Sequence, residues 1–118
     1  MLIRVAARPW PLLAVAGAVV AAEADAEIDA LLARLARSPC AFERNGQWHG
    51  GRDASAHLAT KRRMAPAGAS SATEAFIDGI ASRSSQSGQP YRVRCPGAPE
   101  QPAADWLQRQ LDALRSGR

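Results

Sequence analysis

Residues 40–51, CAFERNGQWHGG, decide the fold of this chain. Asn45 and Gly46 form a strong short-range signal for a β-hairpin, because both tolerate the positive φ of a type I′ turn. Cys40 and Phe42 alternate with residues that point to the opposite side, which indicates a half-buried strand. The glycine pair that closes the stretch is expected to break the second strand. The sequence therefore predicts a hairpin over residues 40–49.

A third strand is predicted over Tyr91 to Cys95, where apolar residues alternate with two arginines. If this strand runs antiparallel to the first, a single register satisfies both the cysteines and the apolar pattern. That register gives the pairs Cys40–Cys95, Phe42–Val93 and Arg44–Tyr91. The expected sheet has three antiparallel strands.

Four helices are predicted around these strands. They are a helix from Asp25 to Arg37, one that Asp53 caps and that runs to about Met64, one with Ser71 as N-cap and Glu74 in a capping box, and a last one that begins at Pro102. Trp106 is expected in the core. The fold class is therefore α+β, a small three-stranded antiparallel sheet packed with four helices.

The N-terminal segment is typical of a secretory signal peptide. Arg4 and Arg8 precede an apolar run of about 13 residues, and small residues follow at Ala22 and Ala24. The run is shorter than the roughly 20 residues that a membrane-spanning helix needs. We therefore expect a signal peptide over 1–24, a single domain over 25–118, a periplasmic location, and no stable membrane anchor after cleavage.

Cys40 and Cys95 are the two cysteines of the chain. In an exported protein, two thiols most simply form one disulfide. There is no Cys-x-x-Cys motif, and a zinc site would need two more ligands. Only His49 and His57 are available for that, at a spacing that matches no zinc pattern. We expect a disulfide, no metal and no cofactor.

The charge balance is mildly basic. The chain has 15 Lys and Arg against 11 Asp and Glu, for a formal net charge of +4. Only residues 61–63 form a run of cations, and three charges do not make a stripe that binds nucleic acid. A nucleic-acid partner is therefore not expected.

Several blocks of the chain, taken together, resemble the YfeK-like family of small exported proteobacterial proteins. The likeness extends over about Glu27 to Val93. Its blocks are FERNG at 42–46, His57 and Leu58 with Lys61, TEAFI at 73–77, and SSQSGQPY at 84–91. The resemblance implies a periplasmic protein of unknown function, and it transfers no catalytic residue.

Six polar residues are the candidates for a binding site. They offer hydrogen-bond donors without competing acids, which suits a carboxylate, a phosphate or a peptide terminus. The set is Arg44, His57, Lys61, Ser84, Ser85 and Tyr91. The leading hypothesis is a soluble, non-catalytic binding or interaction module, with an envelope protein, a peptide or an anionic wall fragment as partner.

Other interpretations of the same residues remain open. A scaffold role would have His57 bond a loop carbonyl, the serines complete a turn, and Arg44 stack on Tyr91 as a cation–π pair. A small hydrolase would use Ser84 or Ser85 as nucleophile, His57 as base and Asp53 to orient it, although no Gly-x-Ser-x-Gly elbow is present. An inhibitor of a secreted enzyme is a further alternative. Trp48 is expected either as an exposed contact residue or packed on Phe42.

Overall fold

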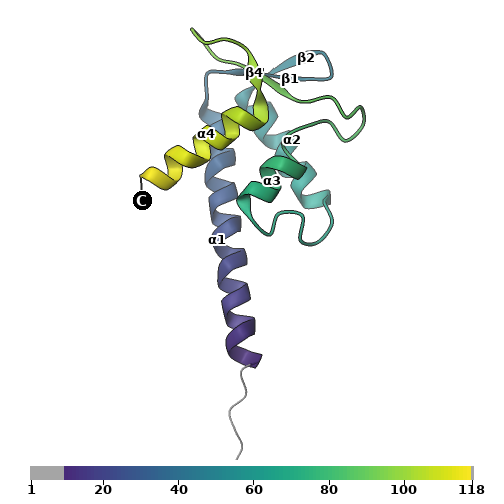
Figure 1. The fold of residues 1–118 in the computed structure, drawn as a ribbon. Coiled ribbons are helices and arrows are strands. Elements are labelled where there is room, and N and C mark those ends of the chain that lie inside the picture. Colours follow the sequence, from purple (N-terminus) through teal and green to yellow (C-terminus); the bar gives the residue numbers. More distant parts are fainter. Residues whose placement is uncertain (1–9, 118) are drawn as a thin grey trace, which may run out of the picture.

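The computed structural model describes residues 10–117 (Figure 1). Residues 1–9, which carry both arginines of the predicted signal peptide, and residue 118 lie outside the described residues. The elements are α1 (Trp10–Arg37), β1 (Ala41–Arg44), β2 (Gln47–Gly50), α2 (Gly51–Met64), α3 (Thr73–Gly79), β3 (Arg92–Arg94), β4 (Gln101–Pro102) and α4 (Ala103–Ser116). The α+β class and the four helices are confirmed for this part of the chain.

The predicted hairpin is present. Asn45 and Gly46 both have positive φ, at 51° and 85°, as a type I′ turn requires. On its other edge β1 pairs antiparallel with β3, and Phe42 lies opposite Val93 as predicted. The hairpin turn and the buried apolar pair thus fix one register together.

The expectation of three strands is wrong, because β4 adds a fourth. This two-residue strand pairs antiparallel with β3, and the sheet order is β2-β1-β3-β4. Pro102 lies in β4 and is also the N-cap of α4, one residue before the helix rather than its first residue. Proline lacks an N–H group, and an edge strand tolerates that loss because one of its sides needs no donor.

The predicted disulfide between Cys40 and Cys95 is present, with an S–S distance of 1.98 Å. It joins the residue before β1 to the residue after β3. Phe42 packs on Trp106 of α4, with ring centroids 5.3 Å apart in an edge-to-face arrangement. Trp106 is buried, as predicted. The disulfide thus joins the two central strands, and the aromatic pair packs the sheet against α4.

Helix α2 begins directly after β2, three residues earlier than predicted. Its N-cap is Gly50, and Asp53 lies in the first turn instead of capping the helix. Gly51 is where α2 approaches α1. A Cβ atom built there would lie 2.3 Å from the carbonyl oxygen of Leu35. The glycine pair therefore ends the strand and also allows two helices to pack closely.

The predicted capping box of α3 is also wrong. The N-cap is Ala72, with no side-chain capping bond. Glu74 instead binds Arg115 near the end of α4 at 2.6 Å, and this hydrogen bond lowers the pKa of Glu74. Arg115 also binds the buried Glu27 at 2.7 Å, and Glu27 accepts a hydrogen bond from the Thr73 hydroxyl. This ion-pair cluster, rather than a local cap, fixes the start of α3.

Helix α1 extends beyond the helix predicted from the sequence. It runs without interruption from Trp10 through Ala24, and Figure 1 shows its N-terminal half projecting away from the rest of the fold. Residues 17–23 are exposed, and Ala24 is the first buried residue after them. Within residues 10–117, no helix combines the length and apolar character needed to span a bilayer. Cleavage after Ala24 stays a prediction.

Candidate functional site

All six predicted site residues line one surface cleft. Its volume is about 310 Å³. The lining residues are Arg44, Asn45, His57, Lys61, Ser84, Ser85, Gln86 and Tyr91. None of them has a carboxylate side chain. The structure therefore brings together residues that are up to 47 positions apart in the sequence, as Arg44 and Tyr91 are.

Four segments deliver these side chains. Arg44 is the last residue of β1, beside the hairpin turn. His57 and Lys61 are four residues apart on α2 and so share one face of the helix. The loop over 84–90 supplies both serines. Tyr91 comes just before β3 and closes the cleft.

The Tyr91 hydroxyl contacts both His57 and Lys61 in the cleft. It lies 3.2 Å from Nε2 of His57 and accepts a hydrogen bond of 3.1 Å from Nζ of Lys61. The Lys61 ammonium also lies 5.0 Å from the centroid of the tyrosine ring. A second bond of 2.7 Å runs from Lys61 to the carbonyl oxygen of Arg83. The residue of α2 that bonds a carbonyl next to the loop over 84–90 is therefore Lys61, and not His57.

The predicted stacking of Arg44 on Tyr91 is wrong, because Lys61 is the cation that faces this ring. The reason lies in the backbone. The Tyr91 N–H donates to the Ser82 carbonyl at 3.0 Å, and the Tyr91 carbonyl accepts from Ala103 at 2.8 Å. Tyr91 thus leaves the β1–β3 ladder. Among the described residues, the Arg44 guanidinium has no hydrogen-bond or ion-pair partner.

Burial and charge shift the pKa values of three groups in the cleft. The pKa of His57 lies below its ordinary value of 6.5, first because of burial and then because of Arg44, Lys61 and His49. Burial also lowers the pKa of Lys61 and raises that of Tyr91, where Arg44 acts in the opposite direction. At neutral pH the cleft therefore has a neutral imidazole beside the positive charges of Arg44 and Lys61.

Ser84 has a structural role in the loop. Its side chain is buried, and its Oγ accepts hydrogen bonds from Nδ2 of Asn45 and from the backbone N–H groups of Gln86 and Ser87. Its own backbone bonds Gln89 and Gly88 across the turn, at 2.9 Å each. The prediction that a serine completes the turn is confirmed for this residue. Ser85 is exposed at the edge of the cleft.

The contacts do not assemble a serine triad. The ring nitrogen of His57 that forms a side-chain bond faces Tyr91. In the part of the chain that the structure covers, no hydrogen bond joins His57 to Ser84, Ser85 or Asp53. A serine nucleophile needs a base within hydrogen-bond reach to remove its proton. The described contacts therefore do not include the serine–base pair that acyl transfer would need.

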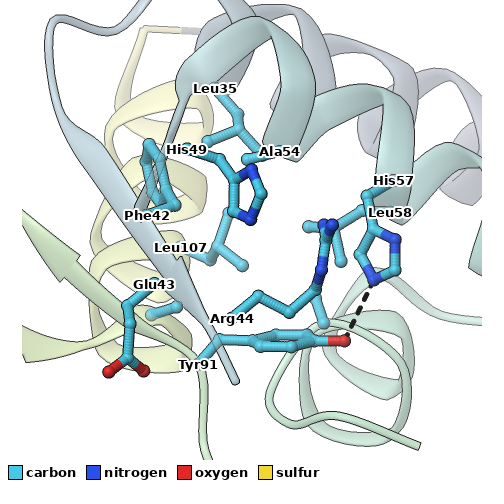
Figure 2. Close-up of a pocket in the computed structure, with 12 residues that line it drawn as sticks. Leu35, Phe42, Glu43, Arg44, His49, Ala54, His57, Leu58, Tyr91 and Leu107 are labelled. Carbon is cyan, nitrogen blue, oxygen red and sulfur yellow. Dashed lines mark hydrogen bonds between the residues drawn. The ribbon is translucent and has the colours of Figure 1, made fainter. Parts of the chain in front are cut away.

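A small apolar cavity of about 30 Å³ adjoins the cleft. Figure 2 shows the side chains of Arg44, His49 and His57 around this space, and Leu35, Phe42 and Leu107 line it as well. The cavity is about large enough for one water molecule. Sequence reasoning did not assign His49 to the site. The hairpin register could have found it, because His49 lies opposite Phe42 and so shares its face.

Both expectations for Trp48 need correction. It is half-buried, and the Arg94 guanidinium lies 4.1 Å from its ring centroid. The hairpin register places it opposite Glu43, on the other face of the sheet from Phe42.

Over residues 10–117, no group of three or more His, Cys, Asp and Glu side chains is placed to hold a metal ion.

Comparison with known proteins identifies a family. The model of DUF5329, a family of unknown function, matches residues 22–115. The chain belongs to this family. No curated protein and no solved structure matches the chain. Membership of DUF5329 brings no activity with it, so the function has to be inferred from the cleft itself.

Proposed function

We propose that this protein is a soluble, exported, non-catalytic binding module, and that its cleft binds the anionic group of a ligand or partner. The lining of the cleft is the observation that carries the proposal. Two cations, an imidazole and a tyrosine hydroxyl meet there, and no acidic side chain lines the cleft. A carboxylate or phosphate would receive charge-assisted hydrogen bonds, which are about twice as strong as neutral ones.

Arg44 is the residue best placed to bind the anion first. Its guanidinium has no partner among the described residues, whereas Lys61 already bonds Tyr91 and the Arg83 carbonyl. A free guanidinium can grip a carboxylate or a phosphate with two parallel N–H···O bonds. His57 is neutral in the empty cleft and gains a proton more readily once an anion binds beside it.

Three observations support export to the periplasm. The Cys40–Cys95 disulfide is of a kind that persists in oxidising compartments. Residues 17–23 are exposed and Ala24 is buried, so of the residues 17–24 a cut after Ala24 would remove one buried residue and leave the core from Ile28 onward intact. The resemblance to the YfeK-like proteins implies the same compartment. N-terminal sequencing of protein from a periplasmic fraction is expected to begin at Asp25, and an intact Met1 would contradict this.

The binding proposal is tested by titrating the ¹⁵N-labelled protein with N-acetylglycine and, separately, with inorganic phosphate. We expect saturable amide shifts for at least one probe, centred on the lining of the cleft. Arg44→Gln and Lys61→Gln should each weaken binding by about tenfold or more, the loss of one charge-assisted bond. Arg109→Gln, on the exposed side of α4, is the matched control. Shifts that do not saturate for either probe, or an equal loss in the control, would overturn the proposal.

A further inference from the structure

A second depression meets the cleft along one side. This groove has a volume of about 560 Å³. It lies between the end of α2, the segment that follows it, and the end of α3. Its lining residues are Lys61, Met64, Ala65, Pro66, Ala69, Gly79, Ile80 and Ser85. Lys61 and Ser85 line both the cleft and the groove, so the two are continuous.

The groove is apolar where the cleft is polar. Lys61 and Ser85 supply its polar side chains, at the boundary with the cleft. Met64 lines the groove and is 80% exposed. Among the described residues outside α1, no other large apolar residue is exposed. An unbranched thioether side chain adapts its shape to a partner. An exposed apolar surface beside polar residues is typical of a binding surface.

The boundary between cleft and groove limits the chemistry of the ligand. A carboxylate held by Lys61 and Arg44 lies at the edge of the groove, so an apolar group reaches the groove only if it is attached close to the carboxylate. The C-terminal residue of a polypeptide meets this requirement, since its carboxylate and side chain leave the same Cα atom. Capture of a C-terminal carboxylate is a known mode of peptide recognition.

The loop over 84–90 offers a further contact to a peptide. The backbone N–H groups of Gln86 and Ser87 are used by Ser84. Across the described residues, the N–H of the exposed Ser85 has no acceptor. A peptide carbonyl can accept from this group, whereas an alkyl chain cannot. A peptide terminus therefore fits the groove better than a fatty acid does.

We infer that the cleft and the groove together bind the C-terminus of a polypeptide whose last residue is apolar. This inference rests on the proposed anion site. Arg44 and Lys61 hold the terminal carboxylate, and Met64 and Ile80 cover the last side chain. The partner is thus a protein or peptide with a free, apolar C-terminal residue.

Calorimetric titration with five probes, four named here and decanoate as the fifth, tests the inference. We expect acetyl-Ala-Ala-Leu to bind at least about tenfold tighter than N-acetylglycine, acetyl-Ala-Ala-Ser and the leucine peptide with an amidated C-terminus, because burial of the leucine side chain adds to carboxylate binding. Met64→Ser should abolish the preference for leucine but leave the affinity for N-acetylglycine unchanged. Lys61→Gln should weaken both ligands, and Arg109→Gln should weaken neither.

Different results would overturn this inference and the anion site on which it depends. Equal affinities for the leucine peptide and N-acetylglycine would overturn the claim that the groove binds the last side chain, but would leave the proposed anion site unaffected. If decanoate binds as tightly as the leucine peptide, the claim that the ligand is a polypeptide C-terminus would be overturned in favour of a fatty acid. Undiminished binding of the amidated peptide would overturn the role of the carboxylate. No binding of any carboxylate probe would overturn both proposals.

Discussion

Removal of the disulfide is expected to lower the free energy of unfolding by about 4 kcal/mol. Cys40 and Cys95 are 55 residues apart in the sequence. In the chain-entropy model, closing a loop of this length removes about 14 cal/mol/K of entropy from the unfolded chain, which is roughly 4 kcal/mol at 25 °C. A domain typically has only about 5–15 kcal/mol of stability in total, so this one bond decides whether the fold is robust.

Urea unfolding of the double variant Cys40→Ala/Cys95→Ala, followed by far-UV circular dichroism at pH 7, measures the loss. With a slope of about 1–2 kcal/mol/M for a small domain, the midpoint should fall by roughly 2–4 M. The wild type in dithiothreitol should show the same fall, and the variant should not respond to the reductant. A loss below about 1 kcal/mol would refute the reasoning, since the sheet would then hold its register without the bond.

Three further changes probe the fold and the site. Gly51→Ala should lower the free energy of urea unfolding by about 1–3 kcal/mol, because the new Cβ would lie 2.3 Å from a backbone oxygen of α1. Gly79→Ala, with open space around the new Cβ, should change that free energy little. Equal losses in the two variants would contradict the close approach at Gly51. The lowered pKa of His57 means that the unfolded chain takes up the proton first as the pH falls. Stability should therefore decrease as the pH falls below about 6.5, and level off once His57 is protonated in the folded state too; a His57→Gln variant with the same slope would speak against this. Ser84→Ala should lower the free energy of thermal unfolding by about 1–3 kcal/mol, since three donors lose their acceptor. Ser85→Ala, at an exposed residue, should leave the melting temperature nearly unchanged. Equal melting temperatures for the two variants would contradict the structural role of Ser84.

Local signals were enough to predict the hairpin, its neighbouring strand and the disulfide. Asn45 and Gly46 accept positive φ, so the turn is set by two adjacent residues. The alternation at Phe42 and Val93 then leaves one register that buries both. The turn depends on adjacent residues and the strands on a period of two, both of which are visible in the sequence, and the disulfide follows from the chain having two cysteines.

Features that no local pattern marks were missed. Strand β4 consists of two residues, and one of them is Pro102, so nothing local marks it as a strand. The cap of α3 was misplaced because Glu74 binds Arg115, 41 residues away. Tertiary packing supplies these bonds, and no pattern within a single helix or strand encodes them.

The candidate site was predictable as a set of residues but not as a set of contacts. The spacing of His57 and Lys61 already places both on one face of a helix. Which cation faces Tyr91 depends on how the chain leaves the ladder at that residue, through its bonds to Ser82 and Ala103. The sequence shows donor chemistry, and the fold decides which donors stay free for a ligand.

The pKa of His57, measured by NMR of its imidazole signals, tests the anion site most directly. The measurement is made on the free protein and again with saturating N-acetylglycine, whose carboxylate stays ionised above about pH 5. A carboxylate bound beside His57 favours the charged imidazole, so we predict that its pKa rises on binding. An unchanged pKa of His57, at a concentration where the amide shifts have saturated, would show that the anion binds elsewhere and would contradict the account.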